Sequence, residues 1–378
     1  MSTRILLGDC RATLRSLPDN SVHCVVTSPP YFGLRDYGTA TWDGGDPLCD
    51  HRGDAQQSHS STLAGNGHGT GKPLSSHLQS MARPFRMTCG KCGANRVDNQ
   101  IGLEPTPAEF VADMVDVFRE VRRVLRKDGT LWLNLGDSYC NDGKWGGRSG
   151  GPNARGGLDR ERIALVPRHR RARSGLKPKD RLMIPARTAI ALQDDGWWLR
   201  DEIVWHKPCP MPSSVKDRTT PAHEMLYLLT KRARYHYDHE AIREPAARPE
   251  GPGNVKPTRS PPGEREGENA NVRGSLHTIG PRETRQKRSV WTVPPSPFKE
   301  AHFATFPPAL VEPCILAGCP EGGTVLDPFG GAGTTALVAN RLRRDAILCE
   351  LNPEYARIAT RRLEADAGLF AQVSAEAA

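Results

Sequence analysis

Short apolar runs alternate with helix-like spacing near the start of the chain. Ile5–Leu7 and His23–Val26 predict two strands, and the residues between them, Ala12–Leu17, predict a short helix. A strand–helix–strand order is typical of a parallel sheet with helices on its faces. The pattern therefore predicts that residues 1–40 form the first part of an α/β core.

The same alternation returns in the middle of the chain. Apolar residues recur every three or four positions from 110 to 125, which predicts a helix that continues to Arg126. Thr106 can cap this helix, Pro107 fits its first position and Gly129 is expected to stop it. A helix at 184–192 and strands at 131–135, 199–205 and 224–230 are predicted next.

The last part of the chain repeats the pattern. Helices are predicted at 307–317, 334–341 and 353–365, with strands at 324–326 and 346–350 between them. Core segments therefore cover residues 1–40, 104–140, 181–240 and 296–378, and the fold class is α/β.

Composition explains the stretches between the core segments. The chain of 378 residues holds 37 glycines and 32 prolines, many of them between the core segments. Such composition buries too little apolar surface to fold alone, so the last two of these stretches are expected to be mobile until bound. The three stretches are an insertion at 41–103, a basic Gly/Arg-rich loop at 141–180 and a linker-like region at 241–295.

Charge and cysteine content indicate the kind of partner and the cellular compartment. Lys and Arg number 52 against 43 Asp and Glu, a net charge of +9 that favours a polyanionic partner such as nucleic acid. No run of 18 apolar residues is present and the start does not resemble a signal peptide, so we expect a cytoplasmic protein without a membrane partner. Ten cysteines in this setting indicate thiols or a metal site more than disulfides.

A glycine-rich turn, DPFGGAG at 327–333, lies between a predicted strand and a predicted helix. Its backbone can approach a ligand closely, and the helix start is electropositive, so a nucleotide-type cofactor fits here. Glu350 ends the next strand and can accept hydrogen bonds from ribose hydroxyls. An ordinary tight strand–helix connection is the alternative.

The tetrapeptide Ser28-Pro29-Pro30-Tyr31 follows the second predicted strand. Two prolines fix the backbone and prevent further strand pairing, which aims the Ser28 and Pro29 carbonyls into a cleft. Oxygen acceptors beside an aromatic ring suit a planar base that bears an exocyclic amine. A proline-rich strand exit without function is the alternative.

Together these motifs resemble the beta group of S-adenosylmethionine-dependent DNA amino-methyltransferases, in which the [DNS]-P-P-[YFW] tetrapeptide precedes the F-x-G-x-G loop. The resemblance implies a class I methyltransferase with a Rossmann-like, mostly parallel sheet and a target-recognition insertion, here the flexible region at 241–295. It covers about half of the chain, in family order: Asp9, TSPPY at 27–31, REVRRVLRKDGTLWLNLGD at 119–137, IVWHKP at 203–208, HEMLYLLTK at 223–231, HFATFPPAL at 302–310 and LDPFGGAGTT at 326–335.

The resemblance also implies roles for single residues. The catalytic base pocket would consist of Ser28, Pro29, Pro30 and Tyr31. The S-adenosylmethionine site would consist of Asp9, Thr27, His302, Phe303, Ala304, Thr305, Asp327, Pro328, Phe329, Gly330, Gly331, Gly333, Thr334 and Glu350.

The resemblance also narrows the substrate and the partners. Serine at the first tetrapeptide position is associated mainly with cytosine N4 in the family, so Ser28 favours cytosine over adenine N6. Double-stranded DNA is the expected substrate of a monomer or homodimer of prokaryotic or phage origin, with a cognate restriction endonuclease as a further partner. The same features are compatible, less well, with a non-catalytic zinc-containing DNA-binding protein or with an RNA methyltransferase.

Four residues in the first insertion predict a structural zinc site. Cys89-Gly90-Lys91-Cys92-Gly93 has the C-x-x-C-G spacing of a zinc knuckle, and Cys49 and His51 can complete a tetrahedral set. Unrelated thiol pairs or a redox C-x-x-C would explain the same cysteines without zinc, and His59, His68 and His77 are further candidate ligands.

Three smaller groups of residues have more ordinary interpretations. We expect Cys10 and Cys24 to be core residues, and we expect Trp197, Trp198 and Trp205 to belong to the sheet core and not to stack on bases. A basic run is expected to contact DNA phosphates, with a solvated loop as the alternative: Arg168, Arg170, Arg171, Arg173, Lys177, Lys179 and Arg181.

Overall fold

A computed structural model describes most of the chain as two compact units. The first unit consists of Met1–Ser28, Phe118–Leu135 and Leu192–Ala378, and the second of Pro29–Val117 and Gly136–Ala191. The described residues are 1–33, 39–49, 88–140, 176–177, 179–213, 215–247, 283–296, 306–368 and 372–377. Much of the three predicted insertions, including the parts expected to be mobile, lies outside these residues.

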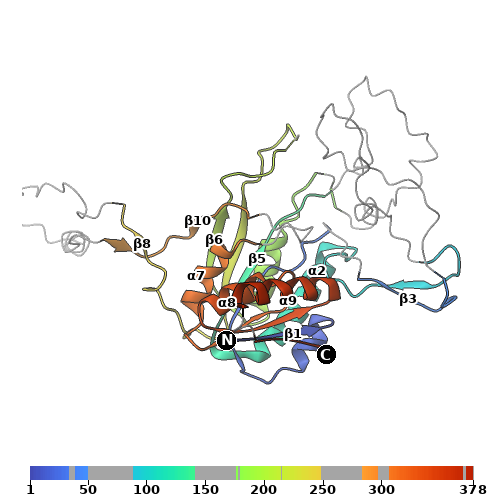
Figure 1. Ribbon diagram of the computed structural model, residues 1–378. Helices are drawn as coiled ribbons and strands as arrows, with labels where there is room; N and C mark the ends of the chain where they lie inside the picture. Colours follow the sequence, from blue (N-terminus) through green and yellow to red (C-terminus); the bar gives the residue numbers. More distant parts are fainter. Residues whose placement is uncertain are drawn as a thin grey trace, which may run out of the picture. The chain divides into compact units, whose positions relative to one another are not determined.

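A nine-stranded sheet forms the centre of the first unit (Figure 1). β7 pairs antiparallel with both of its neighbours, β5 and β6, and the other pairs are parallel. This confirms the α/β fold with a mostly parallel sheet. In sheet order the strands are β10 (Val290–Thr292), β6 (Trp198–His206), β7 (His223–Thr230), β5 (Leu125–Leu135), β2 (Val22–Thr27), β11 (Thr324–Asp327), β12 (Asp345–Glu350), β1 (Ser2–Leu7) and β13 (Gln372–Ala377).

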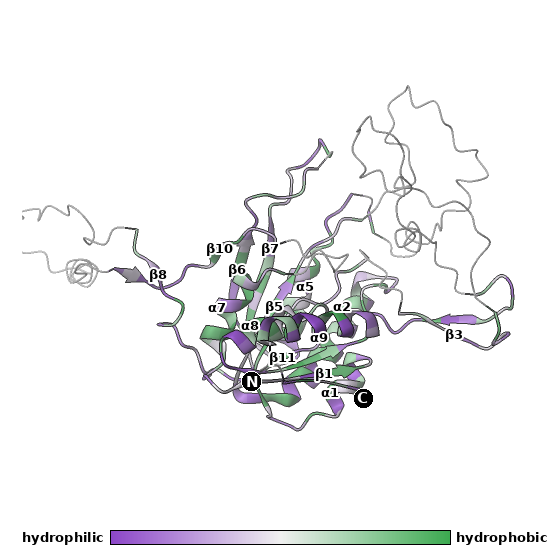
Figure 2. Cartoon of the chain, in the orientation of Figure 1, coloured by the Kyte–Doolittle hydropathy of each residue, from purple (hydrophilic) through white to green (hydrophobic). Residues whose placement is uncertain are grey.

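The helices lie close to the positions that the periodicity predicts. α2 begins with a capping box, in which the Glu109 amide donates to Thr106 Oγ1 at 3.2 Å and the Thr106 amide donates to Glu109 Oε2 at 3.0 Å. Both α2 and α9 carry apolar and hydrophilic residues, as expected for helices that cover a sheet (Figure 2). The helices are α1 (Cys10–Arg15), α2 (Pro107–Val124), α5 (Ile184–Asp194), α7 (Pro308–Gly318), α8 (Thr334–Arg341) and α9 (Pro353–Ala367).

Gly129 does not stop helix α2, and this prediction is wrong. The helix ends at Val124 and β5 begins at Leu125, so Gly129 lies inside the strand. The β2–β5 register shifts between Val22 and Cys24, and a Cβ on Gly129 would lie 2.5 Å from Leu125 Cδ1. Glycine is therefore required at this bulge, where the β5 backbone passes close to the Leu125 side chain.

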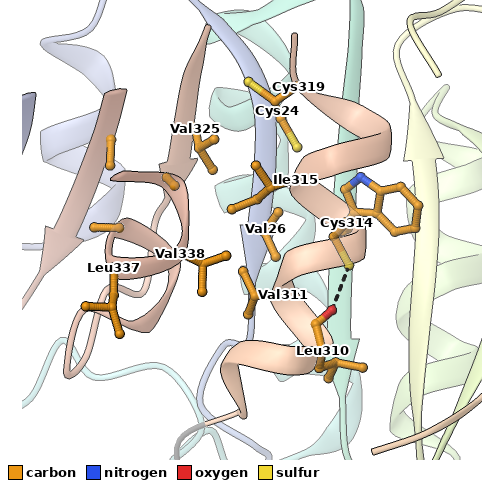
Figure 3. Packing of buried hydrophobic residues seen from close by; sticks show 14 of the residues in the cluster. Cys24, Val26, Leu310, Val311, Cys314, Ile315, Cys319, Val325, Leu337 and Val338 are labelled. Atoms are coloured by element: carbon orange, nitrogen blue, oxygen red, sulfur yellow. Dashed lines mark hydrogen bonds between the residues drawn. The ribbon is translucent and has the colours of Figure 1, made fainter. Parts of the chain in front are cut away.

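Helix α7 packs on the sheet near its centre, where β2 and β11 are neighbours. Leu310, Val311, Cys314 and Ile315 are buried in one cluster with residues of β2, β11 and α8 (Figure 3). Cys10 and Cys24 are buried thiols, as predicted. Trp197 and Trp205 are core residues, whereas the same prediction is wrong for Trp198, which is 45% exposed at the start of β6, because neighbouring strand residues face opposite sides.

Several strands have no clear apolar signal in the sequence. β13 and β10 extend the two edges of the large sheet, and two short antiparallel pairs stand apart from it: β3 (Thr41–Asp43) with β4 (Asn95–Val97), and β8 (Glu244–Pro245) with β9 (Thr284–Arg285). Among the helices of the described residues, none combines the length and apolar character that crossing a membrane requires.

Candidate active site

The predicted cofactor residues of the first unit lie together at the carboxyl ends of adjacent strands of the sheet. β2, β11, β12 and β1 are adjacent and parallel, so their carboxyl ends meet there. These ends carry Thr27, Asp327 and Glu350, and Asp9 follows β1 by two residues. In open α/β sheets this edge is where ligands bind.

Asp327 holds the corner between β11 and α8. Its Oδ1 accepts from Thr27 Oγ1 at 2.6 Å and from the Phe329 amide at 3.0 Å, and its Oδ2 accepts from Thr335 Oγ1 at 2.6 Å. The side chain is fully buried, and this burial raises the pKa of Asp327 to about 6 although the three hydrogen bonds oppose the shift. The carboxylate thus fixes the loop by binding protein groups on both of its oxygens.

The loop between Asp327 and α8 depends on its glycines. A Cβ on Gly330 would lie 2.8 Å from Leu348 Cβ, so the loop lies directly on β12. Gly331 and Gly333 have φ of +50° and +76°, the left-handed region that favours glycine. A Cβ at Gly331 would meet nothing closer than 3.9 Å, so the backbone there borders open space. Of the other predicted loop residues, Pro328 is buried and Phe329 is half-buried.

Glu350 connects this loop to the next strand. Its Oε2 accepts from the Gly331 amide at 2.7 Å and its Oε1 from the Asn352 amide at 2.8 Å. Burial raises the pKa of Glu350 to about 7, against the opposing effect of these amides and with the help of the nearby Asp327 charge. A carboxylate oxygen has two acceptor directions, so both oxygens can also accept a hydroxyl donor.

Arginines support two further predicted residues. Asp9 caps α1 by accepting from the Arg11 amide at 2.8 Å and also from the Arg11 guanidinium at 2.8 and 3.1 Å. Partial burial opposes ionisation of Asp9, but the Arg11 hydrogen bonds outweigh it and lower the pKa. Thr334 begins α8, and its Oγ1 accepts from Arg362 Nη1 at 2.9 Å.

Ser28 is held by a residue of the neighbouring strand β5. Its hydroxyl donates to Asn134 Oδ1 at 3.1 Å, and Asn134 Nδ2 donates to the Met225 carbonyl at 3.1 Å. Asn134 is 1% exposed, so its amide is fixed from both sides. The Ser28 hydroxyl is consequently oriented before any substrate binds.

Within the second unit, two glycines enclose the rest of the tetrapeptide. A Cβ on Gly136 would lie 2.4 Å from Tyr31 Cε2, and a Cβ on Gly102 would lie 3.2 Å from both Pro30 Cβ and the Tyr31 carbonyl oxygen. The Ser138 hydroxyl also donates to the Phe32 carbonyl at 2.9 Å. The Tyr31 ring therefore lies directly on the Gly136 backbone.

Asp137 follows Gly136 and joins its own turn to residues 181–184 of the second unit. Its Oδ1 accepts from the Ser138 amide at 2.9 Å and from the Ile184 amide at 3.0 Å, and its Oδ2 accepts from Arg181 Nε at 2.6 Å. Arg181, predicted to contact phosphates, is thus paired within the protein. Lys177 is 83% exposed, Lys179 is described, and the four arginines from 168 to 173 lie outside the described residues.

Several of these supporting residues have no local signal in the sequence. Four of them contribute polar side-chain atoms: Thr335, Arg362, Asn134 and Ser138. Gly136 contributes because it has no side chain. Four predicted cofactor residues, His302, Phe303, Ala304 and Thr305, lie outside the described residues. So does His51, whereas the structure brings Cys49, Cys89 and Cys92 together.

Comparisons with known proteins agree with this geometry. A model of a DNA methylase family, N6_N4_Mtase, matches residues 22–361. The Type II methyltransferase M.SmaI of Serratia marcescens is 35% identical over 362 residues, which are 96% of this chain and 91% of the relative. M.Cfr9I of Citrobacter freundii, also a Type II methyltransferase, is 38% identical over 95% of this chain and 87% of its own.

A solved structure shows that the fold is shared. The PvuII DNA methyltransferase, described as cytosine-N4-specific, is similar with a TM-score of 0.52 and 17% identity, over 96% of this chain and 86% of its own.

Proposed function

The chain belongs to the S-adenosylmethionine-dependent DNA amino-methyltransferases of the N6/N4 family, and we propose that it methylates the exocyclic N4 of cytosine in double-stranded DNA. Type II methyltransferase is the description of its relatives M.SmaI and M.Cfr9I. For this chain, the choice of cytosine is our inference from Ser28 in the first position of the tetrapeptide.

One observation supports the proposal most strongly: the start of the tetrapeptide is tied to the glycine loop. β2 and β11 pair through Cys24 with Val325 and Val25 with Leu326. The last residue of β2, Thr27, then donates to Asp327 at 2.6 Å. Ser28 follows immediately, so a base-binding hydroxyl lies one residue beyond a hydrogen bond to the loop expected to hold the cofactor.

The residues at the carboxyl ends of β11 and β12 fit S-adenosylmethionine. Glu350 would accept the ribose hydroxyls, because each of its oxygens has acceptor capacity beyond one amide. The open backbone at Gly331 and the amino-terminal end of α8 would allow close approach of the cofactor. When bound, this cofactor would supply an electrophilic methyl group carried on a sulfonium and would leave as the neutral thioether, while the methylated amine would release one proton to water.

The tetrapeptide would prepare the amine for this attack. The lone pair of an exocyclic amine is delocalised into the ring, which makes the nitrogen a weak nucleophile. Because the Ser28 hydroxyl hydrogen points to Asn134, Ser28 Oγ can present a lone pair to the amine, and the Pro29 carbonyl can accept its second hydrogen. These hydrogen bonds would favour a more tetrahedral nitrogen, with positioning as the main source of rate.

The target base must leave the helix for this geometry. The amine is not accessible to a methyl donor inside the base stack, so the base is flipped into the pocket. Tyr31 would stack on the flipped ring. The zinc site that the sequence also predicts is formed by a separate group of cysteines, and the proposed methyl transfer does not use it.

Two substitutions test the assigned pocket. We expect Ser28→Ala and Tyr31→Ala each to lower kcat by a factor of about 100 or more, because groups that act on the reacting base are lost. The Kd of S-adenosylmethionine, measured by calorimetry, should stay within about twofold of the unmodified chain. Ser21→Ala, at a partly buried serine that donates to the Pro18 carbonyl, is the matched control. Unchanged turnover in both variants would contradict the pocket.

We further propose a role in restriction–modification, since the relatives at 35% and 38% identity are Type II methyltransferases. The methylated sites would then resist a cognate endonuclease. Genomic DNA from cells that express the chain should resist a nuclease of the same site specificity, whereas DNA from cells with the Ser28→Ala variant should be cut. Equal cutting of both DNAs would contradict this role.

A further inference from the structure

Three thiols of the second unit lie at the spacing of metal ligands. The Sγ atoms of Cys49, Cys89 and Cys92 all lie within 4.8 Å of one another, and those of Cys49 and Cys89 are 3.9 Å apart. Two thiolates at 2.3 Å from a tetrahedral zinc ion are separated by about 3.8 Å. A disulfide requires a much shorter S–S distance of about 2.05 Å.

The backbone around the thiols is folded for this approach. The Gly93 amide donates to the Cys89 carbonyl at 2.9 Å, and the Cys89 amide donates to the Ala94 carbonyl at 2.8 Å, which closes a tight turn around Cys92. Gly93 takes φ of +75° in this turn. On the other side, the Cys49 amide donates to the Asp46 carbonyl at 3.0 Å, so Cys49 also lies in a turn.

A glycine lets the two turns meet. A Cβ on Gly45 would lie 2.8 Å from Cys92 Sγ and 2.9 Å from Ala94 Cβ, distances too short for a side chain. The neighbouring Gly44 has a similar φ, +72° against +74°, but a Cβ there would meet nothing within 4 Å. The requirement at Gly45 is therefore the approach to the cysteines and not the backbone conformation alone.

The two strands beside the thiols need a cross-link. β3 and β4 have three residues each, and their side chains are exposed or only partly buried. An isolated two-stranded pair is marginally stable in water. A bound ion that joins Cys49 to a turn forty residues later would hold these strands together.

We propose that Cys49, Cys89 and Cys92 bind a structural Zn²⁺ ion as thiolates. Sulfur ligands in tetrahedral arrangement favour zinc over the harder divalent cations, and binding would release the thiol protons. His51 is the fourth ligand that the sequence predicts, but it lies outside the described residues. The proposal rests on the three thiols and is independent of the proposed base specificity.

Elemental analysis of the full-length chain tests the site directly. Protein purified with reductant and supplied with zinc should hold about one zinc ion per chain. Cys89→Ser and Cys92→Ser should lose most of this metal, whereas Cys209→Ser, at an exposed cysteine outside the group, should retain it. Equal zinc in all variants, or none in the unmodified chain, would overturn the proposal.

Two further measurements remain informative if a cysteine variant fails to fold. Cobalt exchanged into the unmodified chain should show the charge-transfer absorption of thiolate ligands. Gly45→Ala should weaken zinc binding about tenfold or more relative to Gly44→Ala, because only the former crowds Cys92. A metal-free, folded chain with a Cys89–Cys92 disulfide detected by mass spectrometry would establish a redox pair instead.

Discussion

Two adjacent chain corners of the protein are stabilised in different ways. At the end of β11, Asp327 accepts from Phe329 and Thr335 of its own segment and from Thr27 of the adjacent strand β2, and the glycines after it allow a tight loop. At the end of β2, Ser28 and Tyr31 are positioned by Asn134 and Gly136, more than one hundred residues later. The first corner depends mainly on its own segment, whereas the second depends on residues at and just after the end of β5.

This difference predicts two classes of variant. Changes at the β11 corner should lower cofactor affinity and stability together, because the loop and the corner share the same hydrogen bonds. Changes in Asn134, near the end of β5, or in Gly136, just after it, should lower turnover and leave cofactor affinity nearly unchanged.

Asp327→Ala should have the largest effect. It leaves the Thr27 hydroxyl and the Phe329 amide without their acceptor, whereas the Thr335 hydroxyl can still donate to the Val26 carbonyl at 3.2 Å. Each buried unpaired group costs about 1–3 kcal/mol. We expect a fall of about 3 kcal/mol or more in the free energy of unfolding. Cofactor affinity should fall at least about 100-fold.

Denaturant unfolding and calorimetry measure the two effects. Asp327→Asn, which keeps one acceptor oxygen, should be affected less in both. Normal cofactor binding by a stable Asp327→Ala chain would show that the corner does not depend on this carboxylate.

Gly136→Ala should have the next largest effect. Its new methyl group would lie 2.4 Å from the Tyr31 ring, so the ring must move. We expect kcat to fall about 30-fold to 100-fold, with the Kd of S-adenosylmethionine changed less than about threefold.

A double-mutant cycle controls for general damage at this position. In the Tyr31→Ala background the added methyl group has no ring to displace, so Gly136→Ala should have little further effect on kcat. Additive losses from the two substitutions would refute the contact as the cause.

The sequence predicted the β11 corner better than the β2 corner, and the reason is physical. Gly331, Gly333 and Glu350 could be found because glycine conformations and an acid after a strand are local signals. Asn134 and Gly136 act through one amide and one missing side chain, and the partner of each lies more than one hundred residues earlier in the chain. The edge strands β10 and β13 were missed for the same reason, since tertiary pairing and not an apolar run forms them.

Asn134→Ala should have a smaller effect than Gly136→Ala. It removes the acceptor that orients the Ser28 hydroxyl but leaves Ser28 itself in place. We expect about a tenfold lower kcat, measured by methyl incorporation into unmethylated DNA. Ser28→Ala combined with Asn134→Ala should be no slower than Ser28→Ala alone, and a further large loss would mean that Asn134 acts by another route.

Acid should weaken cofactor binding modestly through Glu350. Its pKa is about 7 in the folded chain, raised by burial, so the acceptor carboxylate is present above pH 7 and is lost as pH falls below it. We expect the Kd of S-adenosylmethionine to rise about fivefold to tenfold from pH 8 to pH 6. Glu350→Gln should bind weakly at both values, and an unchanged pH dependence in this variant would exclude Glu350 as the titrating group.

The proposal that the chain methylates cytosine N4 is tested by identifying the methylated nucleoside. DNA without prior methylation is incubated with the chain and with S-adenosylmethionine carrying an isotopically labelled methyl group, digested to nucleosides and separated by liquid chromatography with mass spectrometry. We expect label in N4-methyldeoxycytidine, and loss of this product with Ser28→Ala. Label found in N6-methyldeoxyadenosine and absent from deoxycytidine would contradict the assignment of cytosine.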